Sequence, residues 1–325
     1  MKHTEVAIIG AGVTGLAAAS RLSPRNYRIF EKSRGPGGRL ASKRMDTIRA
    51  DIGAQFFTVR DSRFQVTVDS AIAAGFVTQW QPRMGTFRDH QPIASPDQQT
   101  RLVGHPYMNS LSQFLSQDIE ILTERRVQVI EPNGDVFRLI FTSGESCTAD
   151  CVLVTAPVDQ MVAILQHFDV EQLGSRFAMD PTWTTVLSVE EPLRGSDGES
   201  LDALFGGDHP LFDFITVENS KPGRHSNLIV VHATPEWSQQ HLERDPAEIS
   251  DLICQAVWET FQMKTQGRLS HRWRYARPTD PKLRAQKGIY QVAPNLWIAG
   301  DYLAGGRVEG AYLSGLEAAE RILTR

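Results

Sequence analysis

GAGVTG at residues 10–15 lies directly between a short apolar run at residues 6–9 and a small-residue segment at residues 16–22. It has the G-x-G-x-x-G spacing between a strand and a helix, the context in which this motif binds a dinucleotide. The first glycine permits a tight turn, the second lets the backbone approach a pyrophosphate, and the third allows close helix-to-strand packing. The helix N-terminus then offers free N–H groups to the phosphates. The residues expected to contact the cofactor here are Gly10, Ala11, Gly12, Thr14 and Gly15.

A second predicted strand, residues 27–30, is followed by Glu31, whose carboxylate is placed to accept hydrogen bonds from a ribose diol. KSRGPGGRL at residues 32–40 then supplies paired glycines, which allow close backbone approach, and an arginine suited to a diphosphate. The glycine motif predicts a bound dinucleotide but by itself leaves FAD and NAD both open. The contacts expected from this segment are Lys32, Gly38, Arg39 and Leu40.

The far end of the chain adds WIAGDY at residues 297–302 and GGRVEGA at residues 305–311. Together with the G-G-R element at residues 37–39, these segments resemble the FAD-binding amine oxidase superfamily. The resemblance implies non-covalent FAD, with Gly300 and Asp301 at its ribityl chain. It also implies that the helix after them points its N-terminus at the pyrimidine edge of the isoalloxazine, where a helix dipole stabilises negative charge.

The same resemblance implies cofactor contacts elsewhere in the chain. Val127 matches the strand that meets the adenine with backbone groups. The further cofactor contacts implied are Ala54, Gln55 and Phe56, and, from the last helix, Val308, Glu309 and Ala311. For the residues of the last helix, backbone donors matter more than particular side chains.

DIGAQFFTVR at residues 51–60, GHPYMNSL at 104–111 and HRWRYA at 271–276 carry a closer resemblance. Together they resemble the renalase family, particularly its bacterial members, over nearly the whole chain. This resemblance implies an oxidase of isomeric dihydronicotinamide dinucleotides with the hydride misplaced at C2 or C6. Such an enzyme returns NAD(P)+ and passes the electrons to O2, releasing H2O2. Because only one glycine-rich motif is present, the nicotinamide substrate is expected to lie against the flavin as a guest.

Hydride transfer needs a carbon held close to flavin N5 and little acid or base assistance, so the expected groups are positioning groups. They are Phe57, Thr58, Arg60, Thr185 and Tyr302. Aromatic faces are suited to stack on nicotinamide, and Arg60 is suited to meet a substrate phosphate. Burial statistics also allow Phe56 and Phe57 to be core residues.

HRWR at residues 271–274 reads as an alternating strand. His271 is either a general base or a hydrogen-bonded structural histidine. Arg272 and Arg274 share one side of the strand, opposite Trp273, and are expected to shape a surface rather than bind phosphate.

Two other kinds of protein fit the same motifs. An amine oxidase or desaturase on this scaffold would carry identical FAD segments. A non-catalytic nucleotide redox sensor would retain the fold without the turnover. Flavin reduction by amines or by dihydronicotinamides separates these alternatives.

Composition limits the partners. The 325 residues carry a formal net charge of −4, which gives no strong field for nucleic acid. Three cysteines, Cys147, Cys151 and Cys254, are too few for a disulfide framework or a zinc site, so we expect no metal and a cytoplasmic protein. No segment has the length of apolar chain that a membrane span needs. The sequence does not indicate whether the protein is a monomer or an oligomer.

The predicted fold class is α/β, with a Rossmann-like FAD-binding domain of the two-dinucleotide-binding type and a second, α+β substrate domain. The FAD-binding domain is expected to be discontinuous, from residues 1–60, 100–160 and 285–325. The substrate domain is expected from residues 61–99 and 161–284.

Overall fold

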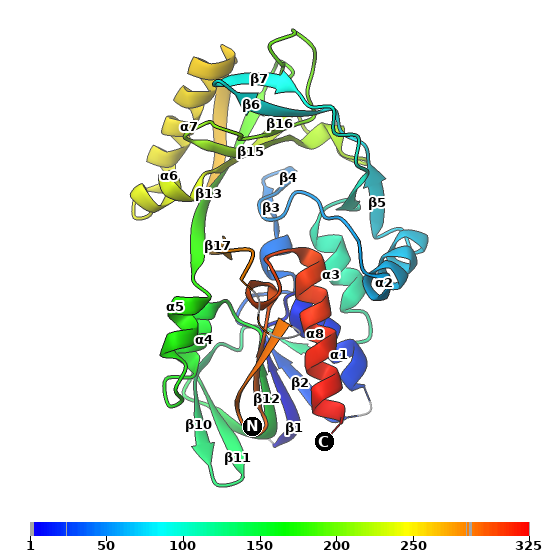
Figure 1. The fold of residues 1–325 in the computed structure, drawn as a ribbon, viewed down its shortest axis with the longest axis vertical. Helices are drawn as coiled ribbons and strands as arrows, with labels where there is room; N and C mark the ends of the chain where they lie inside the picture. Colours follow the sequence, from blue (N-terminus) through cyan, green and yellow to red (C-terminus); the bar gives the residue numbers. More distant parts are fainter. Residues whose placement is uncertain (1–2, 24, 284, 286–287, 325) are drawn as a thin grey trace.

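The computed structural model describes residues 3–23, 25–283, 285 and 288–324. Two domains lie one above the other in Figure 1, each built on one large sheet. β1 (Thr4–Ile9), α1 (Val13–Leu22) and β2 (Tyr27–Phe30) form the expected strand, helix, strand unit, with β1 and β2 parallel. The α/β fold class with a Rossmann-like domain is confirmed.

The first sheet has the strand order β10-β11-β12-β1-β2-β9, and β19 joins it beside β12 with β18 outside β19. β1 is central because its side chains are apolar on both faces, as parallel strands covered on both sides require. The remaining strands are β9 (Ile121–Leu122), β10 (Val127–Asn133), β11 (Val136–Phe141), β12 (Ser146–Val154), β18 (Ile289–Ala293) and β19 (Leu296–Ala299).

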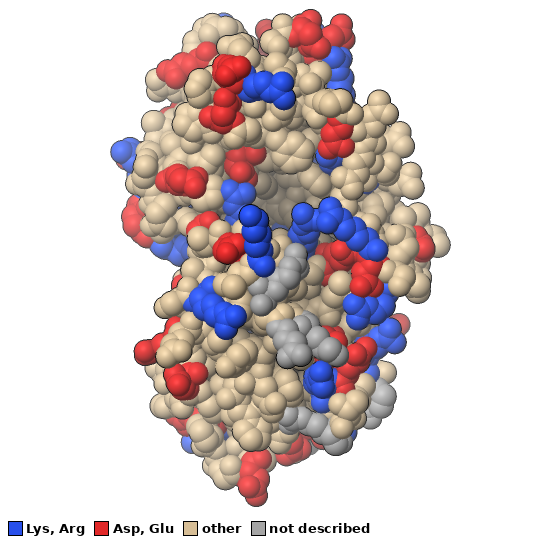
Figure 2. Space-filling model, in the orientation of Figure 1, with Lys and Arg blue, Asp and Glu red and all other residues tan. Residues whose placement is uncertain are grey.

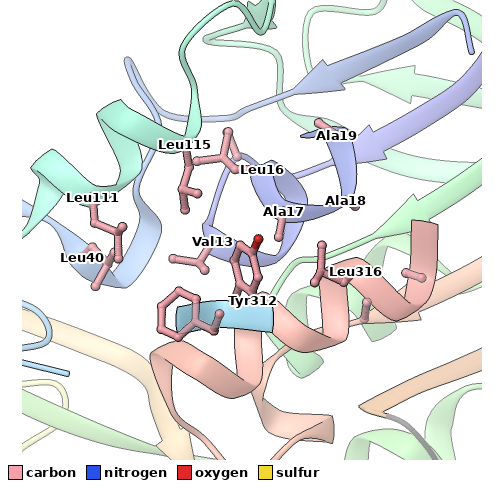
Figure 3. Close-up of a cluster of buried hydrophobic side chains, with 14 of the residues drawn as sticks. Val13, Leu16, Ala17, Ala18, Ala19, Leu40, Leu111, Leu115, Tyr312 and Leu316 are labelled. Carbon is pink, nitrogen blue, oxygen red and sulfur yellow. The ribbon is translucent and has the colours of Figure 1, made fainter. Parts of the chain in front are cut away.

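The last helix, α8 (Val308–Leu323), packs along α1, so the two ends of the chain cover one face of this sheet (Figure 1). The contact is close because Gly315 has no side chain: a Cβ there would lie 2.2 Å from the carbonyl oxygen of Thr14. Figure 3 shows the apolar cluster at this junction, where Leu16 of α1, Tyr312 of α8 and Leu115 of α3 (Asn109–Leu115) meet. This core fixes both helix N-termini relative to each other.

The second sheet has the order β17-β13-β16-β15-β14-β6-β7. Two helices, α6 (Pro235–Gln240) and α7 (Pro246–Phe261), pack on one face of it. The other face looks toward the first domain across the hairpin of β3 (Ser42–Met45) and β4 (Ile48–Asp51) (Figure 1). The strands are β6 (Met84–Arg88), β7 (Gln91–Ala94), β13 (Met179–Val189), β14 (Ala203–Phe205), β15 (Phe212–Val217), β16 (Leu228–Ala233) and β17 (Thr265–Pro278).

The segment at residues 61–99, expected in the substrate domain, divides between the two. β6 and β7 lie in the second sheet. The helix α2 (Ser62–Ala73) instead packs against α8, where the Phe64 ring lies 4.8 Å from that of Tyr312. The other short elements are β5 (Val77–Trp80), β8 (Arg101–Gly104), α4 (Val158–Ile164), α5 (Glu171–Arg176), η1 (Gly38–Leu40), η2 (Glu218–Ser220) and η4 (Asp301–Leu303). Within the described residues, no helix has the length and apolarity needed to cross a membrane.

Candidate cofactor and substrate site

The glycine motif forms the turn from β1 into α1. Gly10 has a φ of +109° and donates its N–H to the Phe30 carbonyl at 2.9 Å. A Cβ on Gly15 would lie 2.1 Å from the Gly10 carbonyl oxygen, whereas a Cβ on Gly12 would meet nothing within 4 Å. Gly12 is the N-cap of α1 and no side chain caps the helix. The N-terminus of α1 is therefore open to a phosphate group, next to the Thr14 side chain.

Glu31 lies just beyond β2 and is buried. Its Oε2 accepts a hydrogen bond from the Ala11 N–H at 2.8 Å, and its Oε1 accepts one from the Ser33 N–H at 2.7 Å. The Arg125 N–H donates to the Glu31 carbonyl, which brings the strand containing Val127 beside the carboxylate. A ribose diol and an adenine would therefore find Glu31 and this strand adjacent.

Two predicted contacts of the 32–40 segment lie elsewhere. The Lys32 ammonium donates to Gln160 Oε1 at 2.6 Å, and burial, followed by the charge of Arg126, lowers its pKa. The Leu40 side chain packs in the core of Figure 3 beside Leu111, so only its backbone is available to a cofactor. An apolar residue beside the paired glycines is used for packing here.

Arg39 and Asp301 join the first and last segments of the site. Arg39 Nη1 donates to Asp301 Oδ2 at 2.8 Å, Arg39 Nη2 donates to Asp301 Oδ1, and Nη1 also donates to the Ala276 carbonyl at 3.1 Å. The G-G-R loop contacts the glycine motif through the Gly37 N–H, which donates to the Ala11 carbonyl at 3.0 Å. The structure thus brings together the three separated segments that the sequence assigns to one cofactor.

The N-terminus of α8 lies on this side of the molecule. Its N-cap residue, Arg307, makes no capping hydrogen bond through its side chain, so the N–H groups of Val308 and Glu309 are open. The Ala311 N–H is already bonded to the Arg307 carbonyl. The Glu309 carboxylate accepts hydrogen bonds from the Arg60 N–H at 2.6 Å and the Asp61 N–H at 2.8 Å, a role for this side chain that the sequence did not indicate.

The turn after β4 contacts Arg39 directly. The Ala54 N–H donates to the Arg39 carbonyl at 2.9 Å, and a Cβ on Gly53 would lie 1.9 Å from that oxygen. The Phe56 ring is partly exposed and lies 5.7 Å from Phe214 of the second sheet. Phe57 is only 4 % exposed and packs on Phe64, so its prediction as a substrate contact is wrong: successive side chains of this extended segment point to opposite sides.

On β13 the residue that faces the first domain is Thr184, and not the predicted Thr185. Thr184 pairs with His232 on β16 and His271 on β17, and this face carries the contacts with the first domain. Thr185 points to the opposite face, where it hydrogen-bonds Ser270 at 3.0 Å on the side covered by α6 and α7. Thr185 is therefore not a substrate contact.

The residues of β17 that the sequence singled out also lie on two different faces of the second sheet. Arg272 and Arg274 both pair with Glu243 on the face of β17 that points away from the first domain, which confirms their surface role. His271 lies on the face of β17 that points toward the first domain, and its ring is 4.5 Å from that of Trp273. The Trp273 indole donates to the Ile52 carbonyl at 2.9 Å. Burial and the nearby Lys43 lower the pKa of His271 to about 4, which makes it a weak base at neutral pH.

Tyr302 is a core residue. It is 1 % exposed, its ring packs edge-on against Phe177, and burial raises its pKa. The absence of a side chain on Gly300 makes room for this ring, because a Cβ there would lie 2.5 Å from it. Tyr302 shapes the loop that carries Asp301 and does not reach a substrate.

Figure 2 shows a hollow between the two domains, with Lys and Arg side chains at its edge. Arg60 is exposed and, among the described residues, its guanidinium has no ion-pair partner. Its neighbour Thr58 is partly exposed. The sequence missed a second group here, the buried charges Asp51, Glu218, Lys221 and Arg224, whose members come from separate segments without a local pattern.

The residues fit FAD. The open helix terminus at Gly12, the Glu31 carboxylate, the Arg39–Asp301 pair and the N-terminus of α8 supply groups for diphosphate, ribose, ribityl chain and ring. They come from one end of the chain to the other, and Gly12, Glu31 and Asp301 each follow the carboxyl end of a strand of the first sheet, β1, β2 and β19.

Known proteins are similar to this chain in sequence. Residues 83–323 match the family described as flavin containing amine oxidoreductase, and residues 8–69 match the NAD(P)-binding Rossmann-like domain. A 4,4'-diapophytoene desaturase of Staphylococcus haemolyticus is 43% identical over 58 residues, 17% of this chain and 12% of that protein. A zeta-carotene-forming phytoene desaturase of Myxococcus xanthus is 44% identical over 50 residues, 15% of this chain and 10% of that protein.

Solved structures show the same fold over the whole length. A provisionally assigned protoporphyrinogen oxidase from Exiguobacterium sp. 255-15 has a TM-score of 0.76, with 14% identity and 99% of each chain covered. Wild-type putrescine oxidase bound to putrescine has a TM-score of 0.71, with 12% identity and 100% of each chain covered. The chain therefore belongs to the flavin containing amine oxidoreductase family and is an oxidoreductase whose cofactor is FAD.

Proposed function

We propose that this enzyme is an FAD-dependent oxidase of isomeric dihydronicotinamide dinucleotides, those with the hydride at C2 or C6, and that it returns them to NAD(P)+. When bound, FAD would accept the hydride at N5 and pass two electrons to O2, which leaves as H2O2 after taking one proton from water. The resemblance to the renalase family at residues 51–60, 104–111 and 271–276 supports this choice within the wider family.

The observation that carries the proposal is the pairing of carboxylates in the cofactor site, at the domain boundary and on β15. The carboxylates of Asp51, Asp213, Glu218 and Asp301 each pair with a Lys or Arg side chain. None of these four is free to hold a protonated amine. Arg60 is an exposed cation at the N-terminus of α8 and is suited to a diphosphate.

The ring-facing surface suits a flat, uncharged ring. Phe56 and Phe214 lie side by side, and Trp273 lies beside His271. Burial, together with the charges of Lys221 and Arg277, lowers the pKa of His232 to about 3, so both imidazoles on this face are neutral at physiological pH. Hydride transfer from such a ring needs positioning rather than an acid or base.

The test is anaerobic mixing of the yellow holoenzyme with one donor at a time. We expect C2- and C6-dihydro isomers of NAD(P) to bleach the flavin rapidly, and ordinary 4-dihydro NADH, putrescine and benzylamine to do so at least about 100-fold more slowly, since near-attack geometry differs. Readmitted O2 should restore the colour with release of H2O2. Rapid bleaching by an amine alone would identify an amine oxidase, and a protein that no donor reduces would support the sensor.

A further inference from the structure

Four charged side chains are buried where the two domains meet. Asp51, Glu218, Lys221 and Arg224 are between 0 and 5 % exposed. Asp51 ends β4 next to the cofactor turn, and the other three belong to the segment between β15 and β16 of the second sheet. Buried ions persist only when they are paired, so this group needs a complete set of partners.

The four charges form ion pairs and sum to zero. Arg224 Nη2 lies 2.6 Å from Asp51 Oδ2, and its Nη1 lies 2.7 Å from Glu218 Oε2. Lys221 Nζ lies 2.7 Å from Glu218 Oε1 and 3.6 Å from Asp51 Oδ2. Two anions therefore balance two cations across the domain boundary.

Lys221 also makes a hydrogen bond with Gln55 of the cofactor turn. Its Nζ donates to Gln55 Oε1 at 2.8 Å, while Gln55 Nε2 donates to the carbonyls of Asp51 at 2.8 Å and Gly53 at 3.0 Å. An ammonium can only donate, so the amide atom that faces it must be the oxygen. The nitrogen is thereby directed at the two carbonyls, and the turn is held closed by its own side chain.

We propose that Lys221 is a positioning residue that orients the Gln55 amide and so holds residues 53–56 in the shape that receives FAD. The opposite side of this turn rests on Arg39, through the Ala54 N–H and the close approach of Gly53. The turn is thus fixed between a cation of the second domain and the cofactor-binding arginine of the first. This inference rests on the FAD placement used in the proposed function, and it does not depend on which molecule donates the hydride.

The experiment is a mutant cycle on the full chain with no hydride donor present. Apoprotein of wild type, Lys221→Met, Gln55→Met and the double variant is titrated with FAD, and the visible spectrum of each holoprotein is recorded. We expect each single change to weaken FAD binding about 10-fold, the effect of losing a hydrogen bond to a charged group, and to shift the flavin spectrum. The double variant should bind FAD no more weakly than the worse single variant, because both changes release the same turn.

Arg272→Met is the matched control. Arg272, like Lys221, is a paired cation of the second domain, but it is only partly buried and lies on the face of β17 away from the cofactor turn. It should lower the melting temperature and leave FAD affinity within about twofold. If Lys221→Met behaved like this control, or if the two losses simply added, the proposal would be overturned.

Lys221→Met leaves two buried carboxylates with one cation and can prevent folding. Gln55→Met leaves all four charges in place and therefore tests the idea alone. Wild-type FAD affinity and spectrum in folded Gln55→Met protein would refute the positioning role. Since no donor is used, a failure to oxidise dihydronicotinamides would count against the proposed function only.

Discussion

The Arg39 guanidinium and the Asp301 carboxylate, 262 positions apart in the chain, form a two-point ion pair. Each belongs to a different segment of the cofactor site, and the pair is formed within the protein itself. The geometry is of the fork type in which arginine cannot be replaced by lysine without losing one bond. The FAD site can therefore form only when the segment around Arg39 and the segment around Asp301 have come together in the folded protein.

Arg39→Lys and Asp301→Asn are expected to weaken FAD binding by about 10- to 100-fold, because each removes a charge-assisted contact and leaves its partner partly buried. FAD titration of apoprotein measures the loss. Arg83→Met, which removes an exposed ion pair with Asp197 and Glu199, is the control and should bind FAD normally. Unchanged affinity in both site variants would contradict the assignment.

Gly12→Ala and Gly15→Ala separate cofactor approach from folding. A Cβ at position 12 meets no protein atom and the backbone there is extended, so the variant should keep its melting temperature and lose FAD. A Cβ at position 15 would lie 2.1 Å from the Gly10 carbonyl, so that variant should be destabilised by several degrees. Thermal unfolding of the two apoproteins, with FAD titration, distinguishes these outcomes; equal FAD binding by Gly12→Ala and wild type would argue against pyrophosphate at this turn.

Arg60→Met should raise the KM for a dihydronicotinamide dinucleotide about 10-fold with kcat nearly unchanged, because a diphosphate contact remote from the reacting carbon contributes uniform binding. The KM of Arg60→Lys should lie between those of wild type and Arg60→Met. Arg63→Met is the nearby control, because the Arg63 guanidinium already forms an ion pair with Asp61. A fall in kcat at constant KM would show that Arg60 acts on the chemical step instead.

Thr184→Val and Thr185→Val test the register of β13 by stability. Thr185 loses a hydrogen bond to Ser270, so its variant should be about 1 kcal/mol less stable. The buried Thr184 hydroxyl has no hydrogen-bond partner among the residues that the structure describes, so its variant should be as stable as wild type or more so. Urea unfolding of both provides the comparison, and the reverse order would refute the assigned faces.

Stability should fall as the pH is lowered from about 6.5 toward 4. The pKa of His232 is lowered to about 3, and those of His209 and His271 to about 4, chiefly by burial. In this window the unfolded chain binds protons at these histidines and the folded chain does not, so acid favours unfolding. His232→Gln should reduce the slope of melting temperature against pH, measured between pH 7 and pH 5. An unaltered slope would contradict the assignment of His232 as a buried neutral group.

The glycine motif could be predicted because the turn from β1 into α1 requires glycine, and Glu31 and Arg39 because their side-chain chemistry suits a ribose and a diphosphate in this context. The place of Asp301 was implied by the family resemblance. The register of β13 could not: the strand is buried on both faces and bulged at two places, so no alternation marks which of Thr184 and Thr185 faces the cofactor. The Phe57 prediction was wrong because nothing in the sequence marks which of Phe56 and Phe57 is buried. The buried charges at 51, 218, 221 and 224 come together only in three dimensions, and in the sequence they look like ordinary surface residues.

The ions buried at the domain boundary also bear on how a substrate enters. Asp51 belongs to the first domain and Arg224 to the second, so a hinge rotation between the sheets would pull a buried ion from its counter-ion. Such a rotation is costly, and we therefore expect the opening in Figure 2 to keep its width when a substrate binds. Entry of a substrate would then depend on the fixed size of this opening and not on closure of the two domains around it.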